Sequence, residues 1–272
     1  MKMTTRISPV LVILTLILTT ALAACSAAAP PPPQAQNVSS ESQTTVDISA
    51  EPVASPVPEP SVDLTTVDDE GNTDIVLTEL QDSLSTATGD LTDAEIASLL
   101  YMREEEKLAR DVYLALYDSW GMQTFQNIAN SEQTHADAVK SLLDTFGLED
   151  PATGKAAGEF SNTDLQALYD QLTATGEQSL GDALKVGAII EEIDIIDLED
   201  SLAMLSDPSI RTVYENLLKG SRNHLRAFTS TLNRQTGEVY EPDYLSVDAY
   251  QAIVGSEIET GGNRRGGNRN RP

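Results

Sequence analysis

Cysteine and basic residues are scarce in this chain, and each shortage excludes a class of function. Cys25 is the one cysteine among 272 residues, so neither an intramolecular disulfide nor a cysteine-based metal site can form. Lysine and arginine number 17 against 43 acidic residues, and the formal charge is −26. Such acidity argues against nucleic acid as a partner and against adsorption to anionic lipid. The chain also contains no glycine-rich phosphate loop, zinc-finger spacing or EF-hand loop.

The N-terminus has the features of an export signal. Lys2 and Arg6 precede an apolar run from Val10 to Leu18, which is too short for a membrane-spanning helix. Leu-Ala-Ala then precedes Cys25, and this sequence resembles the lipobox of bacterial lipoproteins. The resemblance implies that residues 1–24 are a cleaved signal peptide and that Cys25 carries a lipid. The expected product is an exported cell-envelope lipoprotein, anchored to a membrane outside the cytoplasm. The alternative is a secreted protein with an incidental cysteine.

Composition divides the remaining chain into three parts. Residues 25–73 are rich in proline, alanine, serine and threonine and show no period, which predicts a disordered linker. Residues 74–258 carry apolar residues at steps of three and four, which predicts a helical domain. Residues 259–272 hold arginines among glycine and asparagine, which predicts a disordered tail.

Local signals place the helices of this domain. Thr92 begins a capping box, Gly121 and Gly147 end the first two long helices, and Asp207 caps the last. The predicted helices cover about residues 92–120, 124–146, 162–175, 179–205 and 207–236. The first two are joined by a few residues and should pack antiparallel, whereas the next connection is long enough for a crossover. The sequence therefore predicts an all-α fold, an antiparallel four-helix bundle with a long crossover between its second and third helices.

Ionisable residues interrupt the apolar faces of these helices, where burial without a partner is costly. A four-helix bundle with Glu and Glu-x-x-His groups in its interior is the arrangement that binds two iron or manganese ions. Carboxylates bridge such hard cations and imidazoles complete the coordination shell. The candidate residues are Glu106, Glu132, His135, Glu191 and His224.

Two motifs and a wider similarity suggest a family. Residues 106–113 resemble the first-helix pattern E-x-x-A-R-x-x-Y of rubrerythrin, and residues 131–135 resemble the second-helix E-x-x-H of ferritin-like proteins. Residues 92–250 as a whole, with runs such as 101–111 and 220–225, resemble an uncharacterised ferritin-like family, domain of unknown function 2202. The resemblance implies two iron or manganese ions and oxidation of ferrous iron, or reduction of peroxide or oxygen. The implied ligands are Glu106, Glu132, His135, Glu191 and His224.

The last helix departs from the ferritin-like pattern. Ser221 stands three residues before His224, where a glutamate is expected. Asp194, one turn beyond Glu191, is a substitute ligand, and Glu192 is another if the helix is phased differently. The change leaves open a weakly held second ion, a mononuclear site or no site. Ser221 and His224 are not a hydrolase pair, because one helix supplies neither a nucleophile elbow nor an oxyanion hole.

Two other interpretations compete with a metal centre. Glu132 and His135 are also compatible with a solvated helix face, and Arg103 and Arg110 with an ion-pair network that neutralises Glu106 without metal. The corresponding function is a non-catalytic helical domain of the envelope that binds a partner or a second copy of the chain. The absence of a rubredoxin-like cysteine module favours this second class.

Overall fold

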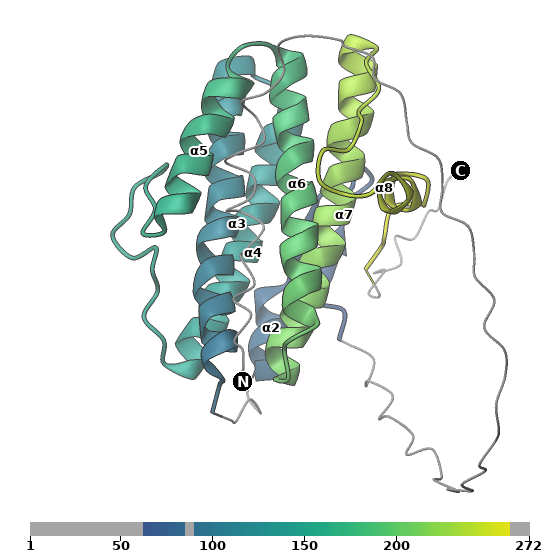
Figure 1. Ribbon diagram of the computed structural model, residues 1–272. Helices are drawn as coiled ribbons and strands as arrows, with labels where there is room; N and C mark the ends of the chain where they lie inside the picture. Colours follow the sequence, from purple (N-terminus) through teal and green to yellow (C-terminus); the bar gives the residue numbers. More distant parts are fainter. Residues whose placement is uncertain (1–61, 85–89, 262–272) are drawn as a thin grey trace, which may run out of the picture. The chain divides into compact units, whose positions relative to one another are not determined.

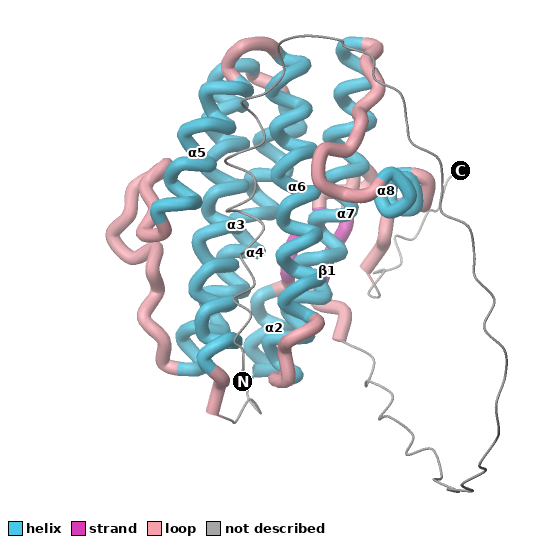
Figure 2. Tube along the Cα trace, viewed as in Figure 1, coloured by secondary structure: helices cyan, strands magenta, loops and turns pink. Residues whose placement is uncertain are grey.

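The computed structural model describes residues 62–84 and 90–261 (Figure 1). The predictions for the signal peptide, for Cys25 and for most of the linker and tail therefore lie outside the described residues. The elements are β1 (Thr65–Val67), β2 (Thr73–Ile75), α2 (Leu77–Leu84), α3 (Asp93–Trp120), α4 (Gln123–Phe146), α5 (Thr163–Gly176), α6 (Leu180–Leu202), α7 (Pro208–Thr236) and α8 (Val247–Val254). The described part is mostly helical, as predicted (Figure 2).

Short-range interactions set the ends of the long helices. The Thr92 side chain accepts a hydrogen bond from the Glu95 backbone, and the Glu95 carboxylate accepts one from the Thr92 backbone. This reciprocal pair is the predicted capping box. Gly121 and Gly147 end α3 and α4 with φ angles of 62° and 67°, in the left-handed region that glycine adopts without strain. Asp207 caps α7 by accepting hydrogen bonds from two backbone N–H groups.

The four longest helices lie side by side. α3 packs against α4 and α6, while α7 packs against α4 and α6 (Figure 1). The loop after α4 and then α5 return the chain along the outside of α3, so that α4 and α6 run in the same direction. Rings of Tyr113, Phe125 and Phe228 meet in the core, with centroids of Tyr113 and Phe228 4.9 Å apart. Among the described helices, none combines the length and apolar character needed to cross a membrane.

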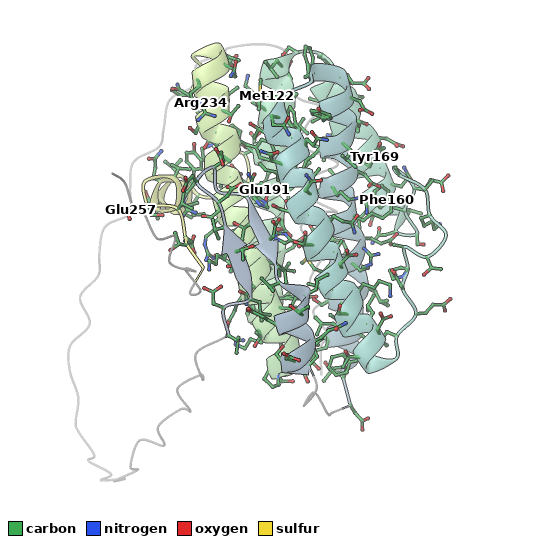
Figure 3. The ribbon with its side chains drawn as sticks, turned by 180° about the vertical axis from the view of Figure 1, so that it is seen from behind. Met122, Phe160, Tyr169, Glu191, Arg234 and Glu257 are labelled. Carbon is green, nitrogen blue, oxygen red and sulfur yellow. The ribbon has the colours of Figure 1, made fainter. Side chains whose placement is uncertain are left out.

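The ordered part begins earlier than the sequence suggests. β1 and β2, which include residues assigned to the linker, form an antiparallel hairpin with Thr65 opposite Ile75. The hairpin lies across α4 and α7 (Figure 3), and its residues Leu64 and Ile75 are buried. Its strands are too short to show an alternating pattern in the sequence, so composition alone does not reveal these strands within residues 62–75. At the other end, Glu259 is held by Arg222 and Arg226, so the ordered chain also extends past residue 258.

Candidate metal centre

Each long helix contributes to one polar cluster in the interior. Glu106 comes from α3, Glu132 and His135 from α4, Glu191 from α6 and His224 from α7. All five are buried, with at most 2% of each residue exposed. Glu191, labelled in Figure 3, lies about midway along the helices. The solvated-face interpretation of Glu132 and His135 is therefore wrong, because the helices enclose both side chains.

The five residues form two groups that share Glu132. In each group the possible ligand atoms lie within 4.8 Å of one another. One carboxylate oxygen of Glu132 lies 2.8 Å from Nδ1 of His135, and the other lies 2.8 Å from Nδ1 of His224. Glu106 completes the first group, with its Oε2 3.4 Å from Nδ1 of His135. Glu191 completes the second group, with its Oε2 3.7 Å from Nδ1 of His224. Glu132 is thus placed between two three-residue groups.

Several buried atoms of the cluster have no partner in hydrogen-bond geometry, although Nδ1 of each histidine lies in an ion pair with Glu132. They are Oε1 of Glu106, Oε1 of Glu132, Nδ1 of His135 and both ring nitrogens of His224. Native proteins leave few buried polar atoms unsatisfied, and an ion is one accepted reason. Carboxylate oxygen and imidazole nitrogen are the donors that iron and manganese take in helical bundles. The residues present therefore fit a pair of such ions.

Burial and mutual charge shift the pKa values of these groups. Burial raises the pKa of Glu106 to about 8, although His135 opposes the shift, and burial with the charge of Glu132 raises that of Glu191 to about 7. Burial would also raise the pKa of Glu132, but His224 and His135 lower it below its usual value. Burial opposes the charged form of both histidines, yet the carboxylates raise the pKa of His224 to about 9 and that of His135 well above its usual value. A cation must therefore displace protons in order to bind.

Two further residues contact the cluster directly. The Tyr113 hydroxyl donates a hydrogen bond of 2.5 Å to Oε1 of Glu191. The carbonyl oxygen of Thr73, on β2, lies 2.8 Å from Nε2 of His135. Tyr113 is the last residue of the E-x-x-A-R-x-x-Y pattern, so the sequence contained a signal for its position. The sequence contained no signal for Thr73, because its contact with His135 is made by the backbone carbonyl and not by the side chain.

The two substitute ligands considered from the sequence, Asp194 and Glu192, lie outside both three-residue groups. The Ser221 hydroxyl donates a hydrogen bond to Oδ2 of Asp194, and Oδ1 of Asp194 is buried without a partner. Asp194 belongs to neither three-residue group. Glu192 faces away from the cluster, since its Oε2 accepts hydrogen bonds from the backbone N–H groups of residues 243–245 at 2.6–3.1 Å. Glu191, not Glu192, is the residue of α6 that reaches the cluster.

The arginines do not neutralise Glu106. Arg103 pairs with Asp150 at 3.2 Å, and Arg110 pairs with Asp111 at 2.6 Å. The predicted ion-pair network around Glu106 is therefore wrong. In its place, the two histidines lie beside the carboxylates, with ring centroids 5.5 Å apart and planes 19° from parallel.

Comparison with known proteins identifies a family that covers most of the folded region. The family described as an uncharacterized protein domain, DUF2202, matches residues 95–257. The uncharacterized protein MJ0754 of Methanocaldococcus jannaschii is 51% identical over 174 residues, which are 64% of this chain and 94% of that protein. The crystal structure of hypothetical protein MJ0754 from Methanococcus jannaschii matches with a TM-score of 0.62 and 49% identity, over 63% of this chain and 98% of that one.

Proposed function

The chain belongs to the uncharacterized DUF2202 domain family, and from the geometry of its buried cluster we propose that this domain binds two divalent ions of iron or manganese. The observation that carries the proposal is the position of Glu132. Its two oxygens each lie 2.8 Å from a histidine nitrogen, and neither nitrogen has a partner in hydrogen-bond geometry. A carboxylate placed in this way suits a bridge between two cations.

The other residues then have separate roles. Glu106 and His135 would hold one ion, and Glu191 and His224 the other. Tyr113 keeps Glu191 oriented through its hydrogen bond, and Thr73 does the same for His135. Two iron or manganese ions held there would supply one-electron redox chemistry toward oxygen or peroxide, so ferrous-iron oxidation or peroxide reduction is the proposed activity. The surrounding apolar residues exclude water, which strengthens electrostatic interactions within the cluster.

The wider proposal is a ferritin-like four-helix bundle on an exported lipoprotein. The packing of α3, α4, α6 and α7 with α5 in the crossover supports the bundle. The lipobox-like sequence before Cys25 supports a lipid anchor in the cell envelope, and the composition of the predicted linker after it supports a tether. Cys25→Ser should move the protein from the membrane fraction to the soluble fraction. Unchanged membrane association would refute the lipid anchor.

Metal analysis of the purified full chain tests the cluster. After anaerobic loading with ferrous iron or manganese, we expect about two ions per chain, as in two-metal sites generally. Glu132→Ala and His135→Ala should each lower this number. Glu95→Ala is the control, because Glu95 is also buried but bonds the backbone of Ser206 and Asp207. Near-zero metal binding by the unsubstituted protein would refute the proposal.

A second candidate function is a non-catalytic helical domain that binds an envelope partner or a second copy of itself. The observation that favours it is Ser221, which stands where a sixth ligand is expected and bonds Asp194 instead. The histidines and carboxylates also balance part of their charge without an ion. Admission of oxygen to the ferrous protein separates the two functions. New visible absorbance from a bridged ferric pair supports the redox site, and its absence with bound metal supports a structural role.

A further inference from the structure

We infer that the N-terminal hairpin, residues 62–76, positions the proposed metal centre by holding the ring of His135 through the backbone carbonyl of Thr73. The inference rests on the proposed function, because the centre that the hairpin positions is the proposed metal site. The hairpin precedes the residues 95–257 that match the family. It is therefore a part of this chain whose role the family description does not address.

The contact between Thr73 and His135 defines the state of the ring. Nε2 lies 2.8 Å from the Thr73 carbonyl oxygen, which can only accept, so Nε2 carries the proton. Nδ1 then faces Glu132 at 2.8 Å and Glu106 at 3.4 Å. Thr73 and His135 are both fully buried, and rotation of the ring would leave the carbonyl unpaired. A backbone carbonyl in this position is the usual means of orienting a metal-binding histidine.

Three consecutive residues of the hairpin bond the helix residues that flank the candidate ligands. Asn223, next to His224, donates to the hydroxyl of Thr73 at 3.0 Å. Ser131, next to Glu132, donates to the carboxylate of Asp74 at 3.0 Å. Thr134, next to His135, accepts from the backbone N–H of Ile75 at 2.9 Å. The strand β2 is therefore attached to α4 and to α7 at the level of the cluster.

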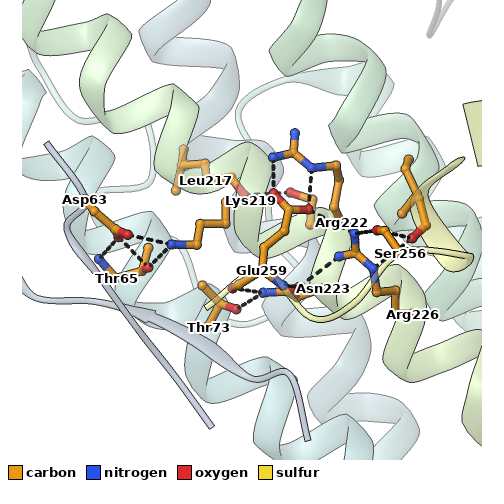
Figure 4. Close-up of polar contacts among 12 residues, drawn as sticks. Asp63, Thr65, Thr73, Leu217, Lys219, Arg222, Asn223, Arg226, Ser256 and Glu259 are labelled. Atoms are coloured by element: carbon orange, nitrogen blue, oxygen red, sulfur yellow. Dashed lines mark hydrogen bonds and ion pairs between the residues drawn. The ribbon is translucent and has the colours of Figure 1, made fainter. Parts of the chain in front are cut away.

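Outer contacts hold the rest of the hairpin on α7 (Figure 4). Lys219 donates to Asp63 and to Thr65, each at 2.9 Å. Asn216 bonds the backbone of Val62 and Leu64. These contacts fasten the first strand as well as the second.

The C-terminal segment closes the same network. Asn223, which bonds Thr73, also bonds the backbone N–H and carbonyl of Glu259. The Glu259 carboxylate pairs with Arg222 at 2.5 Å and with Arg226 at 3.0 Å. The segments on either side of the family-matched region thus meet on α7 at the residue before His224. Loosening β2 should therefore loosen the ring of His135 and leave the helices folded.

The double variant Ser131→Ala/Thr134→Val removes two attachments of β2 and no candidate ligand. Its matched control is Ser141→Ala/Thr145→Val on the same helix, where both hydroxyls bond only α4 carbonyls. Nitrogen-15 histidine NMR of the metal-free full chain is simple to assign, since the chain has two histidines. We expect a slowly exchanging Nε2 proton of His135 in the control and fast exchange in the variant. Manganese affinity should fall about tenfold in the variant alone, with far-ultraviolet circular dichroism unchanged.

The two measurements separate the inference from the proposed function. Exchange and affinity that match the control would overturn the positioning role of the hairpin. Fast exchange with unchanged affinity would equally overturn it, because the ring would then bind metal without being held. If neither manganese nor ferrous iron binds to any of these proteins, the proposed function fails and the metal role of the hairpin fails with it. The exchange rate would still report whether Thr73 holds the ring.

Discussion

Gly220 on α7 lies directly against the ring of His135. A Cβ atom at Gly220 would be 2.5 Å from Cε1 and 2.9 Å from Nε2 of that ring, closer than real Cβ contacts. The ring has no room to retreat, because it is held between the Thr73 carbonyl and the Glu132 carboxylate. The absence of a side chain at Gly220 is therefore a requirement of the candidate centre.

Gly220→Ala should displace His135 and lower manganese binding. Overpacking of this kind costs about 1–3 kcal/mol, offset by up to about 1 kcal/mol of helix propensity. Metal analysis and thermal unfolding would measure the two effects. Gly176→Ala is the control, since its Cβ would lie 2.5 Å from a methyl of Leu116, away from the cluster. Equal loss of metal in both variants would contradict a specific role for Gly220.

At the scale of the element, α6 presents two adjacent glutamates to different parts of the molecule. Glu191 faces Tyr113 and His224, whereas Glu192 accepts hydrogen bonds from three consecutive backbone N–H groups of residues 243–245. Successive residues on a helix point about 100° apart, so one cannot replace the other. α6 thus joins the cluster to the segment before α8.

The two glutamates should respond differently to substitution. Glu191→Ala is expected to reduce metal binding, because it removes a member of the second group. Glu192→Ala should leave metal binding intact but lower stability by about 1–3 kcal/mol, since it leaves three backbone N–H groups without their hydrogen-bond acceptor. Amide hydrogen exchange at residues 243–245 should accelerate in this variant alone. Loss of metal from Glu192→Ala with normal exchange would indicate that the assignment of the two faces is wrong.

At the scale of the whole molecule, the cluster makes stability depend on pH. The pKa of Glu106 is raised from 4.5 to about 8 and that of Glu191 from 4.5 to about 7, so the metal-free fold holds protons that the unfolded chain releases. The pKa of His224 is raised from 6.5 to about 9 with the same consequence. Each of these groups stabilises the fold less as pH rises through its window.

The metal-free protein should therefore lose thermal stability between about pH 5 and about pH 9. Bound manganese should weaken or reverse this trend, because the ion requires deprotonated ligands and binds more tightly as pH rises. Thermal unfolding at several pH values, with and without manganese, tests both statements. The control is His224→Gln, which should make the metal-free loss of stability above about pH 6.5 shallower, although Glu106 still titrates in that range. A metal-free stability that rises across this range would contradict the assigned shifts.

Much of the helical framework was predictable because its signals are local. The helix predicted for residues 92–120 is observed as Asp93–Trp120, and the one for 124–146 as Gln123–Phe146. Caps and left-handed glycines act within one turn, so a sequence read on its own contains them. The same spacing put Glu132 and His135 on one face of α4, since residues three apart lie on the same side of a helix.

Tertiary structure decided which of these residues meet. The sequence leaves the phase of α6 open, and only its packing against α3 and α7 selects Glu191 over Glu192. The hairpin was not predictable, because its strands are three residues long and its bonds reach residues about 60–150 positions away. The sequence by itself determined the long helices and their caps, through interactions within a few residues. The placement of Glu132 between two histidines, and the attachment of Thr73 to one of them, arise only when distant segments pack together.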